Sequence, residues 1–153
     1  MSKKLSWPRW QTWREDDWGV LARCLWLIPA TEWSVRWRPP QRWLHPALTA
    51  GEAAPANAAE RARAAEVARW VDAAYRRSPL ASSCLTQSLV LHRVLRARRL
   101  PSRLRIGVGK PGGAFQAHAW VECAGAPLND RDTLHRHFAP LDNVLAERPL
   151  ESR

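Results

Sequence analysis

Residues 82–89 read SSCLTQSL and mark the start of a helix that begins with a cysteine. Either serine is a suitable N-cap, because its hydroxyl can accept a hydrogen bond from a backbone N–H of the first turn. Apolar residues then recur at helical spacing as far as Leu95, which predicts a helix from Cys84 to about Arg99. A helix N-terminus carries partial positive charge, so this position favours a thiolate over a thiol.

A second helix is predicted upstream of this stretch. Asn57 and Glu60 match a capping box, in which each side chain satisfies a free backbone N–H at the start of a helix. Apolar residues follow at helical spacing from Val67 to Ala74, and Pro79 stops the pattern.

The first 43 residues contain eight of the ten tryptophans and also show helical spacing. The residues expected to share one helix face are Trp10, Trp13, Trp18, Leu21, Leu25 and Ile28. Pro29 should end this helix, and a second short helix should carry Trp33 and Trp37. We expect these side chains mainly to brace the second half of the chain, with some left to contact a partner.

Downstream of residue 103 the apolar pattern changes from helical to alternating, which predicts a strand over residues 103–108. Residues 110–113 read KPGG, a strong turn sequence, and residues 115–123 are the predicted antiparallel partner strand. After a turn at residues 125–127, a third strand should begin at 128–131. Helices followed by antiparallel strands predict an α+β fold.

Length and composition indicate one soluble domain. The chain has 153 residues and a formal net charge of +10, which favours acidic partners such as an acidic peptide. A stretch rich in Ala, Pro and Gly separates a Trp-rich region, residues 1–56, from a catalytic core, residues 57–153. An odd number of cysteines, no signal peptide and no 20-residue apolar run lead us to expect a cytoplasmic protein without a membrane span.

Three side chains with complementary chemistry lie in separate predicted elements. Cys84 begins a helix, His118 lies on the second strand, and Asp130 lies near the third. A thiol, an imidazole and a carboxylate can act as nucleophile, base and the group that orients the base. No carboxylate occurs between Asp72 and Glu122, an interval with nine basic residues, so the surroundings of the thiol should be positive.

Other residues have weaker expected roles. The backbone N–H of Cys84 is the first candidate for an oxyanion hole, and Gln87 is a second candidate donor. Trp120, Arg103 and Arg105 are expected to contact the substrate. No cofactor and no metal site are expected, because Cys123, His135 and His137 lack the paired spacing of a zinc site.

Residues 79–130 resemble the transglutaminase-like cysteine peptidases that mature lasso peptides. The segments that carry the resemblance are CLTQSL at 84–89, LRARRLP at 95–101, LRIGV at 104–108, HAWVE at 118–122 and ND at 129–130. The resemblance implies a transglutaminase-like, papain-like fold. It also implies a catalytic triad of Cys84, His118 and Asp130.

The resemblance further implies a role in peptide maturation. Such peptidases remove the leader from a ribosomally made precursor, and a separate cyclase then closes a macrolactam. A small recognition protein, fused or separate, delivers the precursor in many clusters. Residues 1–56 lack the alternating strands of a fused recognition module, so we expect a stand-alone bacterial peptidase. Its expected partners are the precursor peptide and a separate recognition protein, with the cyclase as a further candidate.

Three other functions remain open at this point. The same triad can transfer an acyl group to an amine, as a transglutaminase-like acyl transferase does. A non-catalytic peptide-binding module could retain the three residues. Positive charge and aromatic side chains also suit nucleic-acid binding, although no motif supports it, and no nucleic-acid partner is expected.

Overall fold

The computed structural model of the protein describes residues 15–37, 55–79, 83–130 and 134–140. Within them, three helices precede a four-stranded antiparallel sheet, which confirms the predicted α+β fold. The helices are α1 (Glu15–Trp37), α3 (Ala58–Arg77) and α4 (Cys84–Ala97). The strands are β1 (Arg103–Gly109), β2 (Gln116–Cys123), β3 (Ala126–Pro127) and β4 (Ala139–Pro140), with short 3-10 turns η2 (Pro111–Gly113) and η3 (Leu134–His137).

The sheet is built around one long hairpin. β1 and β2 pair along their length, with Gly107 opposite His118. β3 adds to the free edge of β2 and β4 to the free edge of β1, which gives the order β3-β2-β1-β4. Gly112 and Gly113 take positive φ in the hairpin turn, a conformation that other residues adopt only with strain. The turn predicted at residues 110–113 is therefore confirmed.

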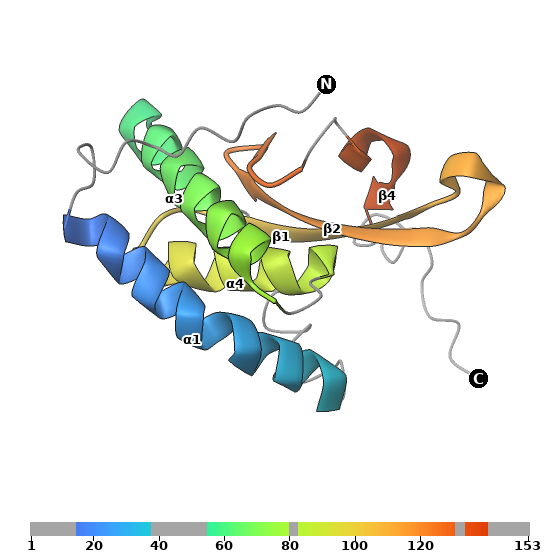
Figure 1. Cartoon of the computed structure of the whole chain (residues 1–153). Coiled ribbons are helices and arrows are strands. Elements are labelled where there is room, and N and C mark those ends of the chain that lie inside the picture. Colours follow the sequence, from blue (N-terminus) through green and yellow to red (C-terminus); the bar gives the residue numbers. More distant parts are fainter. Residues whose placement is uncertain (1–14, 38–54, 80–82, 131–133, 141–153) are drawn as a thin grey trace, which may run out of the picture.

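The two faces of the hairpin have different surroundings. Leu104 and Val121 lie opposite each other on the face that joins the hydrophobic core. His118 and Trp120 alternate with these residues, so they share the other face. Figure 1 shows the helices gathered on one side of the sheet, while the hairpin turn projects away from them.

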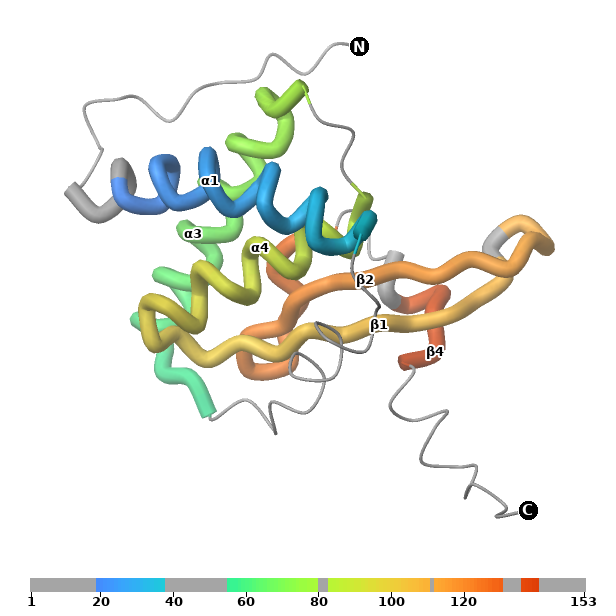
Figure 2. The backbone as a smooth tube through the Cα atoms, turned by 90° about the horizontal axis from the view of Figure 1, so that it is seen from below, coloured from blue at the N-terminus to red at the C-terminus, as the bar shows by residue number. Residues whose placement is uncertain are grey.

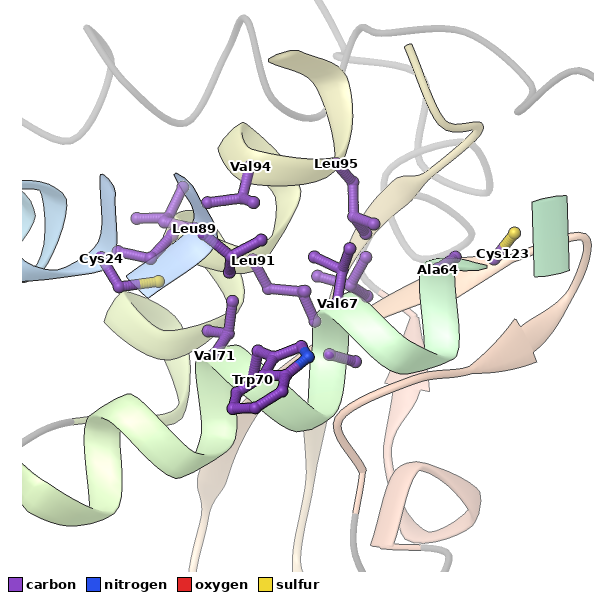
Figure 3. Packing of buried hydrophobic residues seen from close by; sticks show 14 of the residues in the cluster. Cys24, Ala64, Val67, Trp70, Val71, Leu89, Leu91, Val94, Leu95 and Cys123 are labelled. Atoms are coloured by element: carbon purple, nitrogen blue, oxygen red, sulfur yellow. The ribbon is translucent and has the colours of Figure 1, made fainter. Parts of the chain in front are cut away.

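α4 is the central helix of the core. It packs against α1, α3 and the first two strands, and eight of its residues are buried. Figure 3 shows Leu89 and Leu91 of α4 among Cys24 of α1 and Val71 of α3. The cluster continues to Cys123 at the end of β2. Burial of apolar surface contributes about 25 cal/mol per Å² to the stability of the fold. The packing of α4 against α1, α3 and the first two strands therefore holds α4 in place relative to the sheet.

The capping box that begins α3 has the predicted contacts. The backbone N–H of Glu60 donates to Asn57 Oδ1 over 2.9 Å, and the backbone N–H of Asn57 donates to Glu60 Oε2 over 2.8 Å. The helix ends at Arg77, two residues before Pro79. Both ends of α3 therefore lie where its sequence predicts them.

The prediction that Pro29 ends the first helix is wrong. α1 continues through Pro29 to Trp37 as one helix of 23 residues. Proline removes one backbone hydrogen bond, to the carbonyl four residues earlier. That carbonyl belongs to Leu25, and both residues lie on the exposed side of α1, where water can satisfy the freed oxygen.

The buried face of α1 agrees with the predicted one at Leu21 and Ile28 but not at Leu25. Val20, Cys24 and Ile28 pack into the core with α3 and α4, whereas Leu25 is 77% exposed. The large apolar side chains on the exposed side are Leu25, Trp26, Trp33 and Trp37. The predictions for Trp10 and Trp13, and for the side chain of Trp18, fall outside the described residues.

The third strand is shorter and begins earlier than predicted. β3 pairs only Ala126 and Pro127 with the end of β2, and residues 128–130 form no strand. The backbone N–H of Leu128 still donates to the Val121 carbonyl over 2.8 Å, but the N–H of Val121 donates to a side chain, Asn129 Oδ1, over 2.8 Å. Asp130 therefore lies in the segment after β3.

Candidate active site

Cys84 is the first residue of α4, as predicted. Ser83 is the N-cap: its hydroxyl accepts the N–H of Thr86 over 3.2 Å, and Thr86 Oγ1 accepts the N–H of Ser83 over 3.2 Å. The N–H of Gln87 makes the first helical bond, to the Ser83 carbonyl. The N–H of Cys84 precedes that bond and has no acceptor within the helix. An oxyanion donor needs a backbone N–H of this kind.

Cys84 differs from the other two cysteines in exposure. All three are free thiols, but Cys24 and Cys123 are buried and Cys84 is partly exposed. Burial raises the pKa of Cys24 to about 11, although Arg98 acts in the opposite direction. Burial also raises the pKa of Cys123. Only Cys84 among the three combines solvent access with a helix N-terminus, the setting of reactive cysteines.

His118 and Asp130 are in direct contact. Nε2 of His118 lies 3.0 Å from Oδ1 of Asp130, whose side chain is 0% exposed. An ionised carboxylate only accepts hydrogen bonds, so Nε2 carries the proton and the neutral ring keeps its lone pair on Nδ1. This contact is the geometry that an orienting role for Asp130 requires.

α4 is tied to the strand of His118 one turn after Cys84. Ser88 Oγ donates to the carbonyl of Ala119 over 3.0 Å. Figures 1 and 2 both show the first turn of α4 beside β2. Within the described part of the chain no hydrogen bond joins Cys84 to His118, which is common for catalytic pairs before substrate binds.

The imidazole of His118 packs against two aromatic rings. Trp120 stacks on it at a centroid distance of 5.9 Å, and Phe138 lies at 5.3 Å in a tilted arrangement. Gly107 makes room for both rings, because a Cβ there would lie 2.8 Å from the Cβ of Phe138 and 3.0 Å from the indole of Trp120. The missing side chain on β1 therefore allows the packing that holds His118.

The indole N–H of Trp120 is held by the carboxylate of Glu122. Its Nε1 donates to Glu122 Oε1 over 2.8 Å, and Arg105 Nε donates to Glu122 Oε2 over 3.2 Å. Trp120 is only 2% exposed, so the expected contact with substrate is not supported, and the ring packs on His118 instead. Arg105 is engaged with Glu122, while Arg103 lies opposite Glu122 and is partly exposed.

The side-chain amide of Gln87 is bonded to α3. Nε2 of Gln87 donates to Asp72 Oδ1 of α3 over 3.2 Å. Asp72 also pairs with Arg76, one turn further along α3. The amide thus joins α4 to α3 in this structure, and the role of Gln87 as a second oxyanion donor stays a prediction.

Glu122 and Phe138 were absent from the predicted site residues. Strand alternation over residues 118–122 places Glu122 on the face of His118, so the sequence contained a signal for it. Phe138 reaches the site because β4, which follows it, pairs with β1 across some 30 residues of sequence. No local pattern indicates such a contact.

Neither a metal site nor a membrane-spanning helix is found among the residues that the structure describes. No group of three His, Cys, Asp or Glu side chains there could hold a metal ion. Cys123, which begins the loose cluster noted in the sequence, is buried in the core. No helix in the described ranges is long and apolar enough to cross a membrane.

Comparison with known proteins identifies the family. The family model described as the transglutaminase-like superfamily matches residues 24–143, well over half of the chain. The matched range runs from α1 to the segment after β4 and includes Cys84, His118 and Asp130. Neither a curated protein nor a solved structure matches the chain significantly. The described residues form three helices and an antiparallel sheet, with a cysteine at the start of the central helix, and this chain belongs to the transglutaminase-like superfamily.

Proposed function

We propose that the protein is a cysteine peptidase that removes the leader from a ribosomally made lasso-peptide precursor. The hydrogen bond between His118 and Asp130 carries this proposal, since it prepares an imidazole to act as a base beside the helix that begins with Cys84. Burying a carboxylate costs desolvation free energy, and the side chain of Asp130 is fully buried in its pair with His118. Buried charged pairs of this kind are concentrated at functional sites.

The tautomer of His118 defines the mechanism. With Nε2–H held by Asp130, Nδ1 takes the proton of the Cys84 thiol, and the thiolate attacks the carbonyl at the leader–core junction. The N–H of Cys84 donates to the developing oxyanion. The imidazolium then protonates the departing core amine. Water, deprotonated by the same ring, hydrolyses the thioester and frees the leader carboxylate.

Two features support a peptide substrate delivered by a partner. The segments at 84–89, 118–122 and 129–130 match the pattern of lasso-peptide leader peptidases, and a charge of +10 favours an acidic peptide. We further propose that a separate recognition protein delivers the precursor, and that the cyclase acts on the released core. The exposed tryptophans of α1, Trp26, Trp33 and Trp37, are candidate contacts for such partners.

The proposal is tested by mixing the purified protein with a candidate precursor, with and without its recognition protein, and following the products by mass spectrometry. Wild type should release the leader, and Cys84→Ala should release none while keeping its circular dichroism spectrum. Cys123→Ala is the matched control and should retain cleavage, because its thiol is buried in the core. Cleavage by Cys84→Ala would refute the assignment.

Amide-forming acyl transfer is the second candidate, because membership of the transglutaminase-like superfamily favours it. The same thioester would then react with an amine in place of water. Products from the same assay separate the two reactions. Hydrolysis yields a leader with a free carboxylate, whereas transfer in the presence of an added primary amine yields the amide.

A further inference from the structure

We propose that Ser88 and Asn129 are positioning residues that hold the three members of the triad in register; this inference rests on the proposed function. Their side chains form a chain of hydrogen bonds, here called the Ser88–Asn129 clamp, that links the carbonyl of Ala119 to the N–H of Val121. Neither residue touches the reacting atoms. Each acts through a neighbour in sequence.

The clamp consists of three short hydrogen bonds. Ser88 Oγ donates to the carbonyl of Ala119 over 3.0 Å and accepts from Asn129 Nδ2 over 2.9 Å. Asn129 Oδ1 then accepts the N–H of Val121 over 2.8 Å. Each donor in this series of hydrogen bonds therefore meets an acceptor, and both ends of the series are backbone groups of β2.

Each anchor of the clamp lies next to a member of the triad. Ser88 is four residues after Cys84, which places it one helical turn along α4. Ala119 follows His118 directly on β2, and Asn129 directly precedes Asp130. Three segments that are far apart in sequence thus converge on a single hydroxyl, and each of them carries one triad residue.

Burial makes the clamp stiff. Ser88 is 0% exposed, so water cannot replace a partner that moves away. A displacement of α4 relative to β2 would take the Ser88 hydroxyl away from the carbonyl of Ala119, a buried residue, and from the partly buried Asn129 amide. The side chain of Asn129 also takes the place of strand pairing where β3 ends, so it sets the path of the chain into Asp130.

The clamp is needed because the thiol and the imidazole come from different layers. Cys84 begins helix α4, while His118 lies on strand β2 of the sheet. Proton transfer requires these groups within about 3–3.5 Å in the reacting complex, and a misplacement of 1 Å can cost about 100-fold in rate. Among the described residues, Ser88 is the side chain nearest in sequence to Cys84 with a hydrogen bond to β2.

The experiment measures two rates for Ser88→Ala, Asn129→Ala and the double variant. The first is alkylation of Cys84 by iodoacetamide at neutral pH, quantified on the peptide that contains it. This assay needs no substrate, and the burial of Cys24 and Cys123 keeps them out of it. The second is cleavage of the precursor, analysed as separate kcat and KM values.

We expect each single variant to lose about 10- to 100-fold in alkylation rate and in kcat, with KM little changed. The double variant should lose no more than the worse single variant, because the two residues form one chain of hydrogen bonds. Val94→Ala is the stability-matched control. It removes buried volume from the same helix, lowers Tm, and should keep both rates near wild type.

The outcomes separate the clamp from the proposed function. If the alkylation and cleavage rates fall in proportion to Tm in Val94→Ala as well as in the clamp variants, the effect is a general loss of stability. This result would overturn the positioning role of Ser88 and Asn129. Wild-type rates in Ser88→Ala would also overturn it, even if cleavage of the precursor is confirmed. Slowed alkylation of the clamp variants, with no precursor cleaved by wild type, would support the clamp and refute the proposed substrate.

Discussion

At the scale of single residues, proton transfer from Cys84 depends on which nitrogen of His118 holds the lone pair. Asp130 holds Nε2, so Nδ1 has the lone pair. Asparagine at position 130 can present its amide N–H to the ring in place of an acceptor, which would favour the opposite tautomer. The lone pair would then lie on Nε2, away from the position needed for proton transfer.

We therefore predict that Asp130→Asn lowers kcat by about 10²- to 10⁴-fold, as loss of the orienting carboxylate does in hydrolase triads. The fold and Tm should change little, since the two side chains have the same shape. Asp72→Asn is the control, because it makes the same change at an acidic residue that bonds to Gln87 and Arg76. A kcat of Asp130→Asn within threefold of wild type would remove Asp130 from the mechanism.

The sequence was most informative at this scale. Cys84, His118 and Asp130 could be selected because a thiol, an imidazole and a carboxylate have specific chemistry and stand in recognisable segments. The role of Trp120 could not be read in the same way. In the sequence, an aromatic residue near a site suits substrate binding and core packing equally. Only the structure, in which Trp120 is 2% exposed, distinguishes the two roles.

At the scale of secondary-structure elements, the site depends on how closely rings can approach β1. Gly107 has no side chain, and the Cβ of Phe138 and the indole of Trp120 occupy the space where one would lie. Any larger residue must displace a ring that packs on His118. β1 is therefore part of the site although it contributes no reacting group.

Gly107→Ala should lower the free energy of unfolding by about 1–3 kcal/mol, the usual cost of overpacking, and should reduce kcat as the rings shift. Gly19→Ala is the matched change with the opposite expected sign. Gly19 is exposed within α1, and its new Cβ would meet only Arg98 Nη2 at 3.6 Å, so it should gain about 0.5–1 kcal/mol. Urea denaturation measures both; equal effects of the two changes would contradict this packing.

Element boundaries were predictable where local chemistry decides them. The cap of α3 at Asn57 and the turn at residues 110–113 follow from the side chains themselves. Pro29 shows the limit of such rules. The cost of one missing hydrogen bond is outweighed when residues on both sides of the proline, Cys24 and Thr31 among them, bury the same helix face.

At the scale of the whole molecule, one buried base links the fold to pH. His92 lies on α4 and is 3% exposed; its Nδ1 bonds to Ser102 Oγ over 3.1 Å, and its Nε2 has no hydrogen-bond partner among the residues that the structure describes. Burial lowers the pKa of His92 to about 4, and Arg96 and Arg93 act in the same direction. The histidine is therefore neutral in the folded protein at neutral pH.

The sign of the pH effect follows from the two pKa values. Between pH 6.5 and 4 the unfolded chain binds a proton at His92 and the folded chain does not, so acid favours unfolding. The free energy of unfolding should fall across this window by on the order of 3 kcal/mol from this group alone. His92→Gln should flatten that slope in urea titrations at several pH values; an unchanged slope would show that other groups cause it.

Long-range pairing was the part of the fold that the sequence did not reveal. Two-residue strands such as β4 have no periodicity of their own, and Phe138 enters the site only because β4 pairs with β1. Residues 128–130 do not form the expected strand for a related reason: after the backbone bond from Leu128 to Val121, the side chain of Asn129 accepts the N–H of Val121. Such contacts depend on tertiary packing, which local patterns do not encode.

The central claim is that Cys84 forms a covalent acyl-enzyme with the help of His118 and Asp130. The most direct measurement is intact-mass analysis of the protein mixed with precursor and recognition protein and quenched in acid during the first turnover. We predict an adduct with the mass of the leader acyl group, located on Cys84 by peptide mapping and absent from Cys84→Ala. Leader release without any adduct on Cys84, or an adduct that persists in Cys84→Ala, would contradict the account.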